Sequence, residues 1–190
     1  VNKFNEKIEE LISRLPFTLK KKKKRAVGEI FKDLSLEKPM NRLLEGDVGS
    51  GKTVVSAVAM FLSFLNGFQS VLMAPTEILA NQHYQTISKL LSPFGVIVGL
   101  ATGSNKVKMV PSASSGGKWK ILIGTHAVLS ETINFQNLGL VVIDEQQRFG
   151  VEQRALIRSK GKNPHLLTMT ATPIPRTIAL TLYGDLDLSL

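Results

Sequence analysis

The sequence contains no cysteine, which excludes both a disulfide framework and a thiolate metal site. It has only three histidines, and their wide separation argues against a zinc site built from imidazoles: His83, His126 and His165. No apolar run is long enough to cross a bilayer, and the first residues lack the basic-then-apolar order of a signal peptide. We therefore expect a cytoplasmic protein without a membrane partner.

Acidic residues are also scarce. The chain has 24 Lys and Arg against 15 Asp and Glu, a formal net charge of +9 that points to a polyanionic partner. Six of the cations form one block at residues 20–25. About half of such blocks are solvated tails or localisation signals and do not form a binding site. Here the block runs into apolar residues spaced for one helix face, Ala26, Val27, Ile30, Phe31 and Leu34. Because cations at a helix start oppose the macrodipole, we expect an anion nearby, either nucleotide or nucleic acid.

The 190 residues, 43% of them hydrophobic, suit one α/β domain with a substantial core. Helical patterns at 4–15, 26–34, 53–65 and 76–91 alternate with apolar, β-branched runs at 40–44, 70–74, 95–100, 120–124, 140–143 and 166–169. This alternation predicts a mostly parallel sheet covered by helices on both faces. Residues 111–117 form the clearest flexible loop. We expect residues 1–190 to be a single domain, with 1–35 as N-terminal helices leading into it.

A phosphate-binding loop is the most informative motif. Residues 46–53 fit G-x-x-x-x-G-K-[ST]: Gly46, Asp47, Val48, Gly49, Ser50, Gly51, Lys52 and Thr53. A predicted strand precedes the motif and a predicted helix follows it, as the mechanism requires. The glycines let backbone N–H groups converge on phosphates at the helix start. Lys52 can then reach the β- and γ-phosphates, and the Thr53 hydroxyl can ligate Mg²⁺. The sequence therefore predicts that the chain binds a nucleoside triphosphate.

A second site follows the apolar run at 140–143, which delivers two carboxylates, Asp144 and Glu145, to its carboxyl end. Open α/β sheets bind their ligands at that edge. In a phosphate-loop NTPase, the first carboxylate holds Mg²⁺ and the second orients and deprotonates the attacking water. We therefore predict Asp144 as a magnesium ligand and Glu145 as the catalytic base.

The segments around these sites resemble those of the RecG family of bacterial ATP-dependent DNA helicases. The resemblance rests on Met-Asn-Arg-Leu-Leu-Glu at 40–45 with the phosphate loop, Met-Ala-Pro-Thr-Glu-Ile-Leu-Ala at 73–80, Ile-Gly-Thr-His-Ala at 123–127, Asp-Glu-Gln-Gln-Arg-Phe-Gly-Val at 144–151, and Thr-Ala-Thr-Pro-Ile-Pro-Arg-Thr at 170–177 followed by Tyr-Gly-Asp-Leu-Asp-Leu at 183–188. It covers nearly the whole chain, with the motifs in one order.

This resemblance implies a RecA-like motor domain that uses ATP and Mg²⁺ to remodel stalled forks and branched DNA, in the bacterial cytoplasm at the nucleoid. It implies DNA-backbone contacts for nine residues: Pro75, Thr76, Gln82, His83, Thr102, Gly103, Gly124, Thr125 and His126. It also implies that Thr170 and Thr172 couple the phosphate state to DNA contact. The family further implies a second RecA-like domain and a wedge domain, neither of which occurs in residues 1–190.

The sequence departs from the family pattern in three places. Where the family has Leu-Thr-x-x-Gln, with Gln reading adenine, this chain has Leu-Lys-Lys-Lys-Lys at 19–23, so adenine selectivity is open. Gln147 replaces the family His, a change in the direction of the transcription-repair coupling factor. The segment from 104 to 120, which we expect to be a loop, is short for the family. Two other functions therefore stay open: a stand-alone nucleotide- and DNA-binding module with little hydrolysis, and the motor domain of a transcription-repair coupling factor.

Overall fold

The computed structural model describes residues 2–13, 28–30, 32, 39–45, 51–103, 106–110, 119–131, 133–145, 151–170 and 187–189. Within these residues, eight strands form a single sheet in the order β4-β3-β5-β2-β6-β7-β1-β8. The strands are β1 (Asn41–Glu45), β2 (Gln69–Met73), β3 (Val98–Thr102), β4 (Lys106–Val110), β5 (Ile121–Gly124), β6 (Leu138–Glu145), β7 (His165–Thr170) and β8 (Asp187–Ser189). Neighbouring strands pair in parallel except β3 and β4, which are antiparallel. The prediction of a mostly parallel sheet is confirmed.

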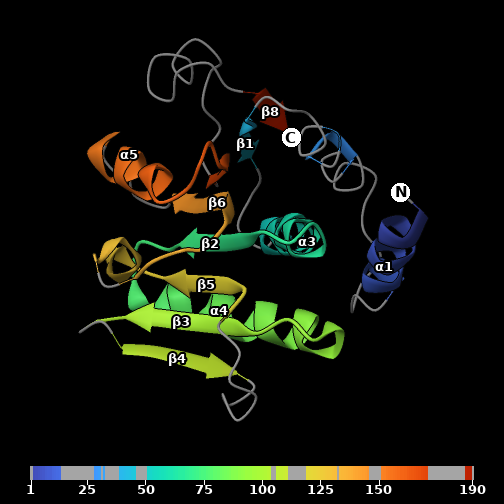
Figure 1. Cartoon of the computed structure of the whole chain (residues 1–190), viewed down its shortest axis with the longest axis horizontal. Coiled ribbons are helices and arrows are strands. Elements are labelled where there is room, and N and C mark those ends of the chain that lie inside the picture. Colours follow the sequence, from blue (N-terminus) through green and yellow to red (C-terminus); the bar gives the residue numbers. More distant parts are fainter. Residues whose placement is uncertain are drawn as a thin grey trace.

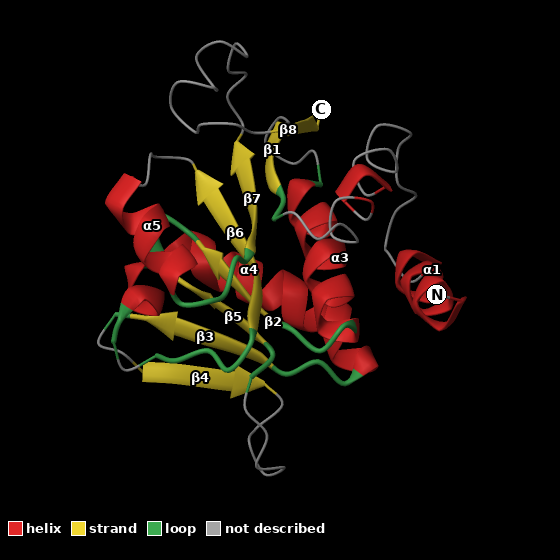
Figure 2. Cartoon of the chain, turned by 45° about the horizontal axis from the view of Figure 1, so that its top comes forward, coloured by secondary structure: helices red, strands yellow, loops and turns green. Residues whose placement is uncertain are grey.

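Helices lie on both faces of this sheet (Figures 1 and 2). One face carries α3 (Lys52–Leu65) and α4 (Glu77–Leu91), which pack on Leu72, Leu140 and Val142. The opposite face carries α5 (Val151–Ser159) and the 3-10 helix η2 (His126–Leu129), which pack on neighbouring residues of the same strands. Because successive side chains of a strand point to opposite faces, each central strand contributes to both cores. This confirms that the sheet is covered on both faces.

The helix α3 lies in the middle of its layer and is buried on all sides. Its ten consecutive residues from Val54 to Ser63 are buried, a pattern expected of a helix enclosed by other elements. The N-terminal helix α1 (Asn2–Ser13) packs against α3 through the buried Leu11 (Figure 1). This enclosure fixes the position of the first turn of α3, which contains Lys52 and Thr53.

The predicted basic helix is described only at Gly28–Ile30 and Lys32, where the chain is helical. Ile30 is buried in the core beside α3, and Glu29 accepts a hydrogen bond at 3.1 Å from the guanidinium of Arg42 in β1. Arg42 itself is buried, so this ion pair fastens the segment to the strand that leads into the phosphate loop. The lysine-rich block at 20–25 lies outside the described residues.

Several elements differ from the sequence-based expectation, and α5 and β8 have no counterpart among the predicted elements. The strand predicted at 95–100 begins only at Val98, because Ser92–Phe94 form a 3-10 helix (η1) that ends in a left-handed Gly95. The strand then continues to Thr102, so Thr102 is a strand residue. The segment 104–120, regarded from the sequence as a loop, contains the edge strand β4. In the described part of the chain, no helix is both long and apolar enough to cross a membrane.

Candidate functional site

The predicted site residues follow strands that run in the same direction, so they gather along one edge of the sheet. The strand order divides that edge into two parts. The predicted nucleotide residues belong to the adjacent strands β6, β7 and β1, where Thr170 of β7 stands in register with both Glu45 of β1 and Glu145 of β6. The predicted DNA residues lie at the ends of the adjacent strands β3, β5 and β2 or in the segments that follow them. The two groups meet between β2 and β6.

The described end of the phosphate loop has the backbone that the motif requires. Gly51 caps α3 in the left-handed conformation, with φ 85° and ψ 20°, a region in which a side chain is strained. Its carbonyl accepts the first two helical hydrogen bonds, from the N–H groups of Val54 and Val55 at 3.1 and 3.2 Å. The amides that precede them point out of the helix start, where the helix dipole also favours an anion. Residues 46–50 lie outside the described part of the chain.

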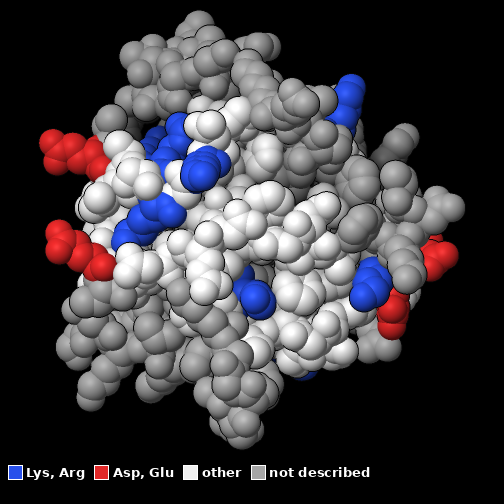
Figure 3. Space-filling view, in the orientation of Figure 1, with Lys and Arg blue, Asp and Glu red and all other residues white. Residues whose placement is uncertain are grey.

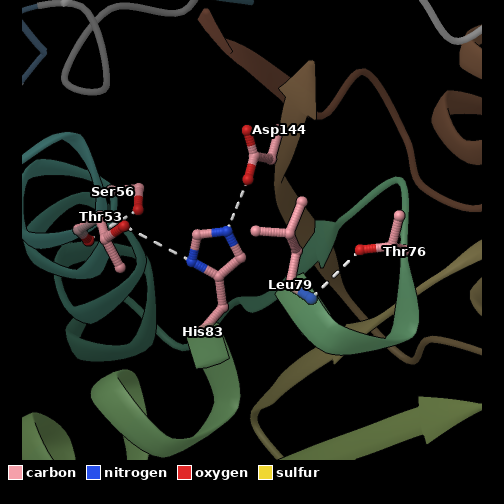
Figure 4. A network of polar contacts seen from close by, with 6 residues as sticks. All are labelled: Thr53, Ser56, Thr76, Leu79, His83 and Asp144. Carbon is pink, nitrogen blue, oxygen red and sulfur yellow. Dashed lines mark hydrogen bonds and ion pairs between the residues drawn. The ribbon is translucent and has the colours of Figure 1, made fainter. Parts of the chain in front are cut away.

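Thr53 and Asp144 come from distant parts of the sequence and face the same imidazole (Figure 4). His83 Nε2 lies 2.6 Å from Asp144 Oδ2, and His83 Nδ1 lies 3.5 Å from Thr53 Oγ1. Asp144 and His83 are each only 8% exposed. The hydroxyl at the start of α3 and the carboxylate at the end of β6 are thus joined through a residue of α4.

The donor set suits a magnesium ion bound together with a nucleotide. A hydroxyl and a carboxylate are hard oxygen ligands, and Mg²⁺ usually takes one or two protein ligands together with substrate phosphates and water. Among the residues that the structure describes, no group of three His, Cys, Asp or Glu could hold a metal alone. The predicted magnesium role of Thr53 and Asp144 therefore depends on ligands from the nucleotide and water. The side chain of Glu145 lies outside the described part, and its role as base stays a prediction.

Several of the predicted DNA residues are accessible at the other part of the edge. Thr76 and Gln82 are exposed, as are Gly103 and His126, whereas Pro75, Thr102 and Thr125 are half-buried. Thr76 also caps α4, because its hydroxyl accepts a hydrogen bond from the Leu79 N–H at 3.2 Å (Figure 4). Gly103 takes a left-handed φ of 61°. These positions are compatible with the predicted contacts and leave them as predictions.

Gly124, a predicted DNA contact, is buried where strands and a 3-10 helix approach closely. A Cβ at this position would lie 2.1 Å from the carbonyl oxygen of Ala101 and 2.7 Å from Val128 Cγ1. The glycine is thus explained by the close approach of β3 and η2 to β5. Packing therefore accounts for the residue type, and a DNA contact by the Gly124 backbone stays a prediction.

His83 is another of the predicted DNA contacts. Its ring is buried, and both ring nitrogens face Thr53 and Asp144. A helical period in the sequence marks this inner face of α4, whose buried residues are Ala80, His83, Ile87 and Leu91. Gln82, one residue earlier, is exposed and stays a DNA candidate. The buried ring leaves no surface for the predicted DNA contact, and its two partners are residues predicted to bind magnesium.

Of the two predicted coupling residues, the structure describes only Thr170. Its side chain is buried, with 4% exposure, at the end of β7 between β1 and β6. This position beside both nucleotide strands is compatible with a coupling role. Thr172 lies outside the described residues, as does Gln147.

Basic side chains gather over α5 on the face shown in Figure 3, with acidic side chains at the rim. The helix and the turn after it contain Arg154, Arg158, Lys160 and Lys162. Lys160 supports the fold: its ammonium donates to the carbonyls of Ser130 and Ile133 at 2.9 and 2.8 Å. Burial lowers the pKa of Lys160, and the nearby Glu131 partly opposes that shift. Basic surface therefore exists independently of the block at 20–25.

The sheet order, the glycine at the start of α3 and the hydroxyl–carboxylate pair define a RecA-like phosphate-loop NTPase domain. More particularly, the chain belongs to the DEAD/DEAH box helicase family, whose profile matches residues 24–181.

Relatives confirm the resemblance to RecG. Over 97% of this chain, the sequence is 54% identical to the ATP-dependent DNA helicase RecG of Synechocystis. Over 100% of this chain, it is 49% identical to the ATP-dependent DNA helicase RecG of Aquifex aeolicus. It covers 22% and 25% of those two proteins, so it spans about a quarter of the curated relatives it matches. The solved structure of RecG bound to a three-way DNA junction superposes with a TM-score of 0.78 and 45% identity, covering 97% of this chain and 25% of that one.

Proposed function

We propose that the chain is the ATP-binding motor domain of a bacterial DNA helicase of the RecG type. Such an enzyme couples ATP hydrolysis to the remodelling of branched DNA or stalled forks in recombination and repair. The observation that carries this proposal is the convergence of Thr53, at the start of α3, and Asp144, at the end of β6, on one buried imidazole. The similarity to RecG proteins over nearly the whole chain supports the choice of DNA as the polymer.

The residues divide the work on the nucleotide. Lys52 and the loop amides at 46–53 bind the phosphates, and the helix dipole of α3 favours their charge. Thr53 and Asp144 hold the magnesium ion, which neutralises the phosphate oxygens when it is bound. Glu145 follows Asp144 on the same strand and accepts the proton of the attacking water. The buried position of Asp144 keeps bulk water from competing for that carboxylate.

DNA lies along the part of the edge formed by β2, β5 and β3. Thr76, Gln82, Thr102, Gly103, Thr125 and His126 supply hydroxyl, amide, imidazole and backbone donors for phosphates, which give affinity without reading the sequence. Thr170 ends β7, which lies between β1 and β6, and Thr172 comes two residues later in the sequence. These two threonines transmit the phosphate state of the nucleotide to the DNA contacts. A second RecA-like domain completes the motor, because related NTPases gain about 10³–10⁵ in turnover from an arginine that such a partner supplies.

The test measures ATP hydrolysis with and without forked DNA, both in the parent protein and in its Glu145→Gln variant. We expect DNA to stimulate hydrolysis when a second RecA-like domain is joined to this chain, and Glu145→Gln in that extended protein to keep ATP binding yet lose turnover, since an amide accepts no proton at neutral pH. ATP binding with no DNA-stimulated hydrolysis, including in a protein extended by a second RecA-like domain, would instead establish a binding module. Undiminished turnover in Glu145→Gln would move the base to another residue.

A further inference from the structure

We propose that His83 is a positioning residue of the magnesium site, which orients both Thr53 and Asp144. This inference rests on the proposed nucleotide site and adds to it a residue outside the phosphate-loop and Asp-Glu motifs. His83 lies on α4, which follows β2, yet its ring reaches the end of the neighbouring strand β6 and the start of α3 (Figure 4).

The partners of the ring define its hydrogen-bonding state. An ionised Asp144 carboxylate only accepts hydrogen bonds, so the 2.6 Å contact requires that His83 Nε2 carries a proton and donates it. In the neutral ring, Nδ1 is then an acceptor, and the group facing it at 3.5 Å is the Thr53 hydroxyl, which can donate. One neutral tautomer therefore serves both partners.

That tautomer also suits the site when an ion is bound. A hydroxyl that gives a lone pair to a cation must send its proton elsewhere, and His83 Nδ1 is an acceptor on that side. A carboxylate held at Oδ2 by His83 keeps Oδ1 for the ion or for its water. Partners that hydrogen-bond to metal ligands fix ligand orientation, and their loss costs roughly 10–100-fold in metal affinity or activity.

The surroundings of His83 hold the ring in place. On the same face of α4, Ala80, Ile87 and Leu91 are fully buried against the sheet and α3. The first turn of α3 is held by its enclosed position, and Ser56 Oγ donates to the carbonyl of Thr53 at 2.8 Å. A fixed imidazole between two fixed elements is an arrangement for orienting ligands.

Two substitutions separate positioning from packing. His83→Leu replaces the imidazole with an apolar side chain of comparable size and so removes the contacts with Thr53 and Asp144. His83→Gln places an amide N–H where Nε2 lies and so restores the donor to Asp144. Gln85→Ala, an exposed position on the same helix, is the matched control.

The measurement is binding of a fluorescent ATP analogue while Mg²⁺ is titrated, with a parallel series in EDTA. In His83→Leu, we expect the Mg²⁺ concentration for half-maximal binding to rise about tenfold, with binding in EDTA unchanged. His83→Gln should recover most of the difference, and Gln85→Ala should behave like the parent protein. Electron paramagnetic resonance of Mn²⁺ bound with the nucleotide should show the same order of affinities without relying on turnover.

An unchanged Mg²⁺ dependence in His83→Leu would overturn the proposal, and so would equal loss in His83→Leu and His83→Gln. If His83→Leu unfolds, His83→Gln is compared with His83→Asn: only the longer amide reaches Asp144, so the proposal requires that Gln alone keeps the Mg²⁺ response. Failure of the parent protein to bind nucleotide in either series would instead refute the proposed function.

Discussion

Gly124→Ala tests whether close packing, as the structure shows, requires glycine at this position. Gly124 ends β5 in register with Ala101 of β3, and the Thr125 N–H donates to the Ala101 carbonyl at 3.2 Å. A methyl group on Gly124 would meet that carbonyl oxygen at 2.1 Å, whereas Cβ contacts below 3.0 Å essentially never occur. The two strands must therefore separate by about 1 Å, and backbone cannot move aside as a flexible side chain can.

The cost follows from these contacts. Overpacking costs about 1–3 kcal/mol, and a site blocked by backbone belongs at the upper end. Weakening the hydrogen bond from Thr125 removes about 1 kcal/mol more. We expect a loss of about 4 kcal/mol in the free energy of unfolding, or a fall of about 8–16 °C in Tm for a chain of this size.

Urea and thermal unfolding followed by circular dichroism measure this loss. Gly67→Ala serves for comparison: Gly67 has nothing within 4 Å of an added Cβ, but it has φ +86°, which Gly124 does not share. It isolates the backbone strain of a left-handed residue, about 1 kcal/mol. If Gly124→Ala were no more destabilising than Gly67→Ala, the packing explanation would be refuted.

Three further predictions concern the ligands. Lys52→Ala should remove most Mg-ATP affinity and leave the unfolding transition in place, because the lysine supports phosphate; equal ATP binding in the variant would refute the phosphate-loop assignment. DNA binding should show no sequence preference and fall steeply from low to physiological salt, as phosphate contacts require, and a flat salt response would contradict the DNA edge. Replacing the five lysines at 20–24 with Gln should lower ATP affinity more than DNA affinity if the block lies at the nucleotide, whereas the reverse order would place it on DNA.

Much of the fold could be predicted because its signals are local. Apolar, β-branched runs such as 140–143 mark strands covered on both faces, and the pattern at 53–65 marks the helix that became α3. The motif residues Lys52, Thr53 and Asp144 were predictable for another reason: phosphate and magnesium chemistry requires those residue types at fixed places after a strand. Both kinds of signal can be read from the sequence without knowing which distant residues come into contact.

The differences from expectation arose where a residue's neighbours come from other elements. The edge strand β4 pairs only with β3 and was regarded as loop, because five residues with alternating apolar character carry little weight in a short segment. Gly124 and His83 were assigned by the motifs that contain them. Each was then explained by a group distant in sequence, the Ala101 carbonyl and the Asp144 carboxylate.

The sequence by itself determined a phosphate-loop motif, a carboxylate predicted to bind magnesium and a sheet with helices on both faces. Only the tertiary structure decided how these parts are arranged. The order β3-β5-β2-β6-β7-β1 separates the DNA candidates from the nucleotide residues along one edge, and no local pattern encodes strand order. That order places α4 beside the boundary, so a histidine 30 residues from Thr53 and 61 from Asp144 lies between them. The helical period of the sequence could place His83 on the inner face of α4. Only the tertiary structure shows that Thr53 and Asp144 are its partners there.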